Sequence, residues 1–267
     1  MNLNEYLPPR VAVVELSGLI GLRLNAREYT KLLASVGENP RIKAVVLDID
    51  SPGGVAHASE DIYLAARRLG ESRPLAAAIR GVGASGAYMV ACAAERIFAI
   101  PSAMVGSIGV ISARPMVEEL LEKAGVRMTV SKSVRFKDMG SFFRPPTEEE
   151  RAKEQAIVDA IHARFTEIVR EGRPGLAPEQ IDDLATGEIY LGTTAREKGL
   201  VDELGTLGEA VQWAAGRAGI DAKSIVMRPR RGLVQLMLQR GASGFIDEIT
   251  ASVVERLYMR SLGIPGY

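Results

Sequence analysis

The sequence predicts an α/β fold built on a parallel sheet, and three observations support this. Strand-like and helix-like segments alternate along the first 100 residues, the pattern that gives parallel sheets with right-handed crossovers. Residues 42–49 form an almost continuous apolar run, as expected for a strand buried on both faces. Hydrophobic residues make up 47% of the 267-residue chain, which is enough to fill a sizeable core.

The predicted elements follow in order along the chain. Strands are expected at residues 11–16, 42–49, 75–79, 96–100, 126–130 and 224–227. Helices are expected at residues 26–35 behind an Asn25 cap, and at 58–69, 117–124 and 207–218. A further long helix should begin after Thr147, because Thr147 and Glu150 have the spacing of a capping box. Its apolar stripe consists of Ile157, Ile161, Phe165 and Ile168.

Three parts of the chain are distinguished by their composition. Residues 1–10, with two adjacent prolines, predict a flexible N-terminal lead, and residues 11–227 predict the main domain. Residues 228–267 begin with a basic cluster and continue with a helical stripe, Ile246, Ile249, Val253 and Leu257, which predicts a C-terminal helical extension. We expect this helix to pack on the domain or on a neighbouring subunit; the alternative is peripheral contact with a membrane surface.

Composition argues against several classes of function. The 33 basic and 33 acidic residues balance, so there is no sign of a nucleic-acid-binding stripe. Cys92 is the only cysteine, in an apolar run that predicts a buried thiol, and the two histidines form no metal-ligand cluster. No cofactor or metal is therefore expected. The longest strictly apolar stretch, residues 87–94, is far below the ~20 residues of a membrane span. This predicts a cytoplasmic or membrane-peripheral protein, unless an N-terminal anchor has been removed.

Ser85 lies where a strand should give way to a helix, between Ala84 and Gly86. Small neighbours permit a sharp turn, and a hydroxyl at a helix N-terminus lies among free backbone N–H groups. Such a serine is either a nucleophile or an ordinary N-cap, and this stretch alone does not decide between them. Gly53-Gly54 also follows a strand, so the glycines and Ser85 are expected to share one rim of the sheet.

A serine nucleophile needs a base to remove its proton. Neither His57 nor His162 is placed by the sequence beside a candidate aspartate, so both are interpreted as ordinary histidines. The other known solution is a serine with a neutral lysine. The pKa of such a lysine would have to fall from about 10.4 to about 7–8, which corresponds to ~4 kcal/mol.

Five sequence blocks together resemble the signal peptide peptidase A family of serine proteases. Any single block is weak, but all five occur in the family's order, and the likeness extends over about residues 11–215. The blocks are Asp-Ser-Pro-Gly-Gly at 50–54, Gly-Ala-Ser-Gly-Ala-Tyr at 83–88, Val-Gly-Ser-Ile-Gly-Val at 105–110, Phe-Lys-Asp-Met-Gly-Ser at 136–141 and Leu-Val-Asp-Glu-Leu-Gly at 200–205.

The resemblance implies a role for each matching residue. Ser85 corresponds to the nucleophile, and Lys137, 52 positions later, corresponds to the general base. Ser107 corresponds to the hydroxyl that orients the lysine. The backbone N–H groups of Gly53, Gly54 and Gly86 correspond to the oxyanion hole.

The resemblance also implies a fold and an assembly. The family's fold is similar to that of the crotonases and the Clp protease subunit, a spiral of ββα units that forms rings. Members cleave signal-peptide remnants or other hydrophobic peptides. This chain is half as long as the tandem-domain members, so we expect it to associate into a homo-oligomeric ring. The usual N-terminal anchor is missing, so the resemblance does not fix the location or the substrate.

Two other functions remain open on the sequence alone. A crotonase-type acyl-CoA hydratase or isomerase shares the glycine-rich oxyanion loops, but it typically uses carboxylates as acid and base. A non-catalytic ring scaffold would keep the fold, although Ser85, Lys137 and both glycine loops are intact. Labelling of Ser85 by a fluorophosphonate probe would separate the peptidase from both alternatives.

Overall fold

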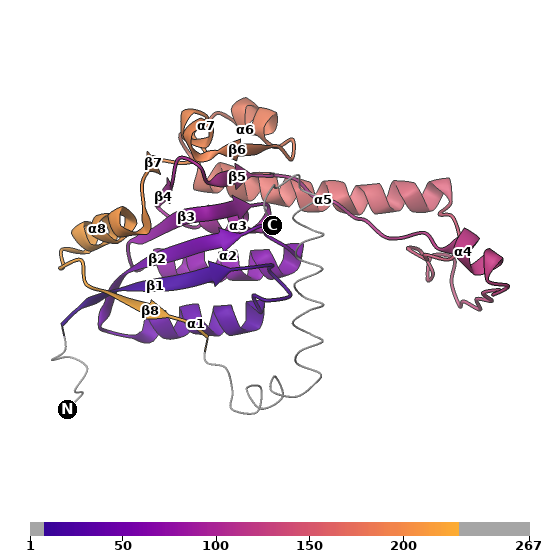
Figure 1. Cartoon of the computed structure of the whole chain (residues 1–267), viewed down its shortest axis with the longest axis horizontal. Coiled ribbons are helices and arrows are strands. Elements are labelled where there is room, and N and C mark those ends of the chain that lie inside the picture. The colour runs from indigo at the N-terminus through magenta and orange to yellow at the C-terminus, as the bar shows by residue number, and fades with distance from the viewer. Residues whose placement is uncertain (1–7, 230–267) are drawn as a thin grey trace. The chain divides into compact units, whose positions relative to one another are not determined.

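The computed structural model describes residues 8–229 (Figure 1). The chain divides into two compact units: unit 1 comprises residues up to Ile108 and from Thr166 onward, and unit 2 is Gly109–Phe165. The predicted main domain, residues 11–227, includes residues of both units. Most of the predicted lead and nearly all of the predicted C-terminal extension lie outside the described residues.

Unit 1 is built on a sheet whose central strands are parallel. Within the described residues the sheet has eight strands, in the order β6-β5-β3-β2-β1-β8; in addition, β4 pairs with β3, and β7 pairs with β4. Only β6 runs antiparallel to its neighbour, β5. The strands are β1 Arg10–Ser17, β2 Ile42–Ser51, β3 Leu75–Ala84, β4 Arg96–Ala99, β5 Met104–Gly106, β6 Ile189–Leu191, β7 Glu203–Leu204 and β8 Ser224–Met227. The predicted α/β class is confirmed.

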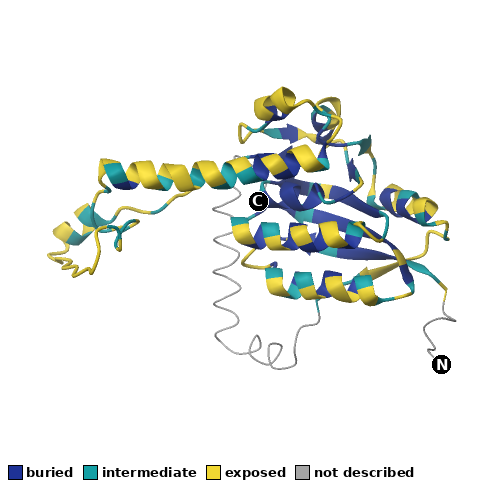
Figure 2. Ribbon diagram, turned by 180° about the vertical axis from the view of Figure 1, so that it is seen from behind, coloured by how far each residue is buried: buried dark blue, intermediate teal, exposed yellow. Residues whose placement is uncertain are grey.

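Helices cover both faces of this sheet. Alternating strand residues point to opposite faces, which explains why β1 and β2 are apolar at nearly every position. One set packs against helix α8, and the core there includes Val11, Val13, Ala44, Val46, Ala76, Ala78, Ala210, Val211 and Ala214. The other set faces α1 and α2, which lie in front of the sheet in the view of Figure 2.

Helices α1, α2 and α8 begin and end within three residues of the predicted positions. Asn25 caps α1 as predicted, since its Oδ1 accepts a hydrogen bond of 3.3 Å from the Glu28 N–H. No helix among residues 8–229 is long and apolar enough to cross a membrane. The helices are α1 Ala26–Glu38, α2 Ala56–Gly70, α3 Gly86–Ala91, α6 Pro178–Leu184, α7 Gly192–Glu197 and α8 Leu207–Ala218.

Strand β3 is longer than predicted and ends directly at Ser85. The sequence placed its end at Ile79, because glycines usually interrupt strands. Here Gly81 is required by a close neighbour: a Cβ at this position would lie 2.5 Å from Asp50 Oδ1. The same oxygen accepts a 3.1 Å hydrogen bond from the Val82 N–H. This bond holds the last residues of β3, those beyond the predicted end, against β2.

Unit 2 contains helix α4, Glu118–Lys123, an irregular segment, and the first part of α5, Glu148–Gly172. The capping box is confirmed: the Thr147 N–H donates to Glu150 Oε2 at 2.8 Å, and the Glu150 N–H donates to Thr147 Oγ1 at 3.2 Å. The strand expected at residues 126–130 is wrong. These residues are irregular and exposed, because the described part of unit 2 offers no strand with which they could pair.

Candidate active site

Ser85 occupies a sharp turn between β3 and α3. Its φ of 51° and ψ of −128° are rare for a residue with a side chain, and such a conformation costs about 1–3 kcal/mol. Two hydrogen bonds enforce the turn: the Ser85 N–H donates to Gly106 O at 2.8 Å, and Ser85 O accepts from the Met89 N–H at 3.0 Å. The flanking residues Ala84 and Gly86 are buried, whereas Ser85 itself is half-buried. The turn therefore leaves Ser85 partly accessible to solvent, between two buried neighbours.

The loop that follows β2 packs directly against this turn, as the shared rim predicted. A Cβ at Gly53 would lie 2.6 Å from Gly86 N and 2.9 Å from Ser85 Cβ, so only glycine fits there. A Cβ at Gly86 would lie 3.6 Å from Gly54 N. The backbones of Gly53, Gly54 and Gly86 therefore lie close together beside Ser85, so that amides from both loops can bind the same small group.

The amide of Gly53 already has a partner. It donates to Ser51 Oγ at 3.1 Å, and this hydroxyl, which is fully buried, donates to Gly18 O at 2.6 Å. In the described part of the chain, the amides of Gly54 and Gly86 have no such partner. Gly86 N is moreover among the first N–H groups of α3, which have no partner within the helix. Gly54 and Gly86 are thus the two donors available to an incoming oxygen.

A loop from β1 fixes the backbone of Gly54. The Ile20 N–H donates to Gly53 O at 2.7 Å, and the Val55 N–H donates to Ile20 O at 3.0 Å. A Cβ at Gly54 would lie 2.1 Å from Ile20 O, which explains the second glycine. The sequence analysis gave no role to Ile20 or to Ser51, although Ser51 lies in the block at residues 50–54, because nothing local signals a contact that spans more than 30 residues.

Ser107 and Ser85 follow neighbouring strands of the sheet. Strands β3 and β5 pair in parallel with Ala84 opposite Gly106, so the two serines occupy equivalent positions one residue past the pairing. Ser107 has a φ of 50°, close to that of Ser85, and it is buried, with 6% of its surface exposed. Neither hydroxyl makes a side-chain hydrogen bond with any residue in 8–229.

Lys137 belongs to unit 2 and is exposed there. Its N–H donates to Val134 O at 3.3 Å within a turn, and its side chain takes part in no ion pair within residues 8–229. Ser85 and Lys137 belong to different units, Ser85 to unit 1 and Lys137 to unit 2. His57 is exposed in the first turn of α2, and His162 lies on the unit 2 part of α5.

Ser59 is a further residue that the sequence did not single out. It is fully buried on α2, and its Oγ donates to Val55 O at 3.1 Å. A Cβ at Gly86 would lie only 2.1 Å from this Oγ. Ser59 therefore packs α2 against the start of α3 and sets the position of the Gly86 amide. A serine inside an amphipathic helix gives no signal of such a role.

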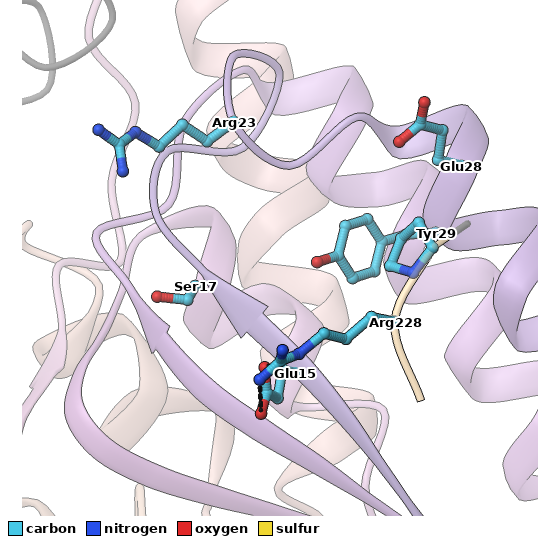
Figure 3. Close-up of a pocket in the computed structure, with 7 residues that line it drawn as sticks. Glu15, Ser17, Arg23, Glu28, Tyr29 and Arg228 are labelled. Atoms are coloured by element: carbon cyan, nitrogen blue, oxygen red, sulfur yellow. Dashed lines mark hydrogen bonds and ion pairs between the residues drawn. The ribbon is translucent and has the colours of Figure 1, made fainter. Parts of the chain in front are cut away.

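A cavity of about 460 Å³ lies near the carboxyl end of β1 (Figure 3). Arg228 forms a paired contact with Glu15 there, with N–O distances of 2.5 and 2.8 Å, and this contact lowers the pKa of the Glu15 carboxyl. The lining contains both signs of charge, so this cavity does not provide an apolar peptide pocket. Its walls are Glu15, Ser17, Arg23, Glu28, Tyr29, Arg228 and Pro229.

Comparison with known proteins identifies the family. The model of peptidase family S49 matches residues 67–221, a range that contains Ser85, Ser107 and Lys137. A "putative protease" from Synechocystis sp. is 38% identical over 216 residues, which cover 81% of this chain and 77% of that protein. A "putative signal peptide peptidase SppA" from Enterococcus faecium is 34% identical, over 70% of this chain and 54% of that protein.

A third relative, Protease 4 from Haemophilus influenzae, is 33% identical over 80% of this chain, which spans 36% of the relative's length. The mostly parallel sheet agrees with the crotonase- and Clp-like fold that the sequence resemblance implied. The match to the family model, the similarity to these relatives and the fold lead to one conclusion: this chain is a member of peptidase family S49, the family of the signal peptide peptidase A proteins.

Proposed function

We propose that this peptidase is a serine endopeptidase in which Ser85 is the nucleophile and Lys137 the general base. Ser85 Oγ attacks the carbonyl carbon of the scissile peptide bond while the neutral Lys137 amine accepts the hydroxyl proton. The resulting ammonium returns this proton to the leaving amine as the C–N bond breaks, which leaves an acyl-enzyme. Water, activated in the same way, then releases the acid and regenerates Ser85.

The observation that carries this proposal is the strained Ser85 turn packed against two available amides. A tetrahedral intermediate places negative charge on the former carbonyl oxygen, and Gly54 and Gly86 are the donors suited to bind it. One such donor typically contributes about 3 kcal/mol to transition-state stabilisation. Gly53 instead supports the loop, since its own amide donates to Ser51.

We further propose that Ser107 orients the lysine. Ser107 directly follows β5, just as Ser85 directly follows the neighbouring strand β3, so one amine could accept the Ser85 proton and contact Ser107. The paired positions follow from the register of the sheet rather than from flexible side chains. This supports a fixed geometry for a base that approaches from outside the sheet.

The lysine is proposed to come from an adjacent subunit of a closed homo-oligomeric ring. Unit 2 has few buried residues, and several of its large apolar side chains are exposed, among them Ile111, Leu120, Val134, Phe142 and Ile157. Association with another copy would bury these side chains and would remove water from Lys137. Desolvation favours the neutral amine that the mechanism requires.

The proposed substrates are hydrophobic peptides, including signal-peptide remnants. The relative from Enterococcus faecium carries the name of a signal peptide peptidase, and the sequence blocks of this chain resemble that family. The turn itself supports access by an extended peptide, because Ser85 is flanked on both sides by small residues.

The first experiment tests the chemistry. A fluorophosphonate probe should label the wild-type protein at Ser85, and both Ser85→Ala and Lys137→Ala should abolish peptide cleavage while keeping the fold. Because the two residues act as one unit, the double variant should lose no more activity than either single variant. Cleavage near the wild-type rate by folded Ser85→Ala would refute the proposal.

The second experiment tests the shared site. The inactive Ser85→Ala and Lys137→Ala proteins are mixed under conditions in which subunits exchange. If each site uses two chains, some mixed sites regain both groups and activity returns. A mixture that stays inactive despite demonstrated exchange would show that the serine and the lysine act within one chain.

A further inference from the structure

Arg144 connects the segment that carries Lys137 to the first turn of α5. Its Nε donates to Asp138 Oδ2 at 3.0 Å, while Nη1 and Nη2 donate to the two carboxylate oxygens of Glu150 at 2.9 and 2.7 Å. Glu150 has only 3% of its surface exposed and is itself fixed by the Thr147 capping box. All of these residues lie within unit 2, so the network is complete in one unit.

The residue that Arg144 holds is the one directly after Lys137. Arg144 contacts both the carboxylate of Asp138 and, at 3.4 Å, its main-chain carbonyl. Lys132 Nζ lies 2.6 Å from the other carboxylate oxygen, Oδ1. The Asp138 side chain therefore has two cationic partners, whereas Lys137 has no ion-pair partner among residues 8–229. The Asp138 carboxylate is therefore paired with Arg144 and Lys132 rather than with the neighbouring lysine.

The charges in this network cancel. Arg144 and Lys132 supply two positive charges, and Asp138 and Glu150 supply two negative charges. The contact with Arg144 lowers the pKa of Glu150 to about 2, and Lys132 followed by Arg144 lowers the pKa of Asp138, so both carboxylates are ionised at neutral pH.

Other charged groups in the region have partners of their own. Arg135 pairs with Glu149, and Arg114 pairs with Glu154. Lys153 Nζ lies 4.6 Å from the centre of the Phe136 ring. Removing Arg144 would thus leave one uncompensated negative charge beside Lys137, and this charge would favour its ammonium form.

We propose that Arg144 is a positioning residue for Lys137, because it anchors the lysine segment to α5 and neutralises its two carboxylate partners, Asp138 and Glu150. This inference rests on the proposed role of Lys137 as the base. It assigns no contact with substrate to Arg144. The effect is expected in the turnover number and in its pH dependence, while substrate binding stays nearly unchanged.

The test compares pH–rate profiles of two variants whose charge changes are opposite. Arg144→Gln should lower kcat by roughly 10- to 100-fold, with KM within about two-fold, through misplacement of the base. Its rising limb should move to higher pH by about one unit, since a negative charge is left uncompensated. Asp138→Asn should also lower kcat, but its rising limb should move to lower pH, because a negative charge has been removed.

Arg135→Gln is the matched control. Arg135 also pairs with a glutamate near the start of α5, but it does not contact Asp138, and 70% of its side chain is exposed, so that water and salt screen its charge. Its profile should therefore follow the wild type. Arg144→Lys should restore the position of the limb but only part of kcat, because an ammonium group cannot reproduce the paired contacts. Circular dichroism of each variant establishes that α5 is intact.

Shifts in the same direction for Arg144→Gln and Asp138→Asn, or no shift in either, would overturn the inference. Lys137→Ala, measured alongside, separates a failure of this inference from a failure of the proposed function. An inactive Lys137→Ala with unshifted Arg144→Gln refutes the role of Arg144 alone. An active Lys137→Ala refutes the base itself, and the positioning role falls with it.

Discussion

Replacing Gly53 with alanine should silence the enzyme without unfolding it. The new Cβ would lie 2.6 Å from Gly86 N, and an ordinary contact begins near 3.4 Å, so the loop and the Ser85 turn must separate by about 0.8 Å. A misplacement of about 1 Å in a catalytic group lowers the rate by about 10²-fold, equivalent to about 2.7 kcal/mol. We therefore expect kcat for peptide cleavage to fall by roughly two orders of magnitude.

The positive φ of Gly53 adds a separate cost in stability, and a second variant isolates it. Gly53 has a φ of +92°, and Gly187 has a φ of +83°, but a Cβ at Gly187 would meet no other atom within 4 Å. Both alanine variants should lose about 1–2 kcal/mol of unfolding free energy from backbone strain, measured by urea denaturation. Only Gly53→Ala should lose activity. If its kcat stays within two-fold of that of Gly187→Ala, the loop does not position the site as described.

Three further predictions concern stability and reactivity. Ser85→Gly should be more stable than Ser85→Ala by about 1 kcal/mol in urea denaturation, because glycine tolerates a φ of 51°; equal midpoints would show that the turn is not strained. Burial raises the pKa of the Cys92 thiol to about 12, so a thiol reagent at pH 8 should label Cys92 only after unfolding, and rapid labelling of the folded protein would contradict its burial. The pKa of Glu150 is lowered, chiefly by Arg144, so its stabilising effect is full above about pH 4.5 and is lost as the pH falls toward 2. The urea midpoints of wild type and Glu150→Gln should accordingly converge near pH 2, and a constant difference would argue against this ion pair.

The sheet of unit 1 could be predicted because its signals are local. The apolar runs of β1 and β2 and the Asn25 cap of α1 are visible within ten residues, and α8 and β8 have the predicted bounds. The end of β3 was not predictable in this way. Gly81 is tolerated there because the side chain of Asp50, on a neighbouring strand, occupies the space that a Cβ would take.

The candidate site, too, could be predicted from the sequence only in part. The sequence placed Gly53, Gly54 and Ser85 on one rim, and in the structure Gly53 lies against Ser85 while Gly54 lies near Gly86. It did not indicate that the Gly53 amide is already bound to Ser51, since this depends on how the loop folds back. The catalytic roles of Ser85 and Lys137 stay predictions.

Unit 2 was the least predictable part of the chain. Val126, Met128 and Val130 alternate as in a strand, but an alternating pattern gives a strand only where a partner edge exists. These side chains are instead about half exposed. By contrast, the start of α5 was predicted correctly, because a capping box is satisfied by residues three positions apart.

The matched backbones of Ser85 and Ser107 have a consequence for how this protein can change over evolution. Their separation is set by the spacing of neighbouring strands, about 4.8 Å, and by the pairing of Ala84 with Gly106. Substitutions in the surrounding core can alter volume and stability, but they do not alter this repeat. Moving one hydroxyl relative to the other would require an inserted or deleted residue in β3 or β5, which would turn every following side chain of that strand to the opposite face. We therefore expect the residues around Ser85 and Ser107 to vary in identity far more freely than β3 and β5 vary in length.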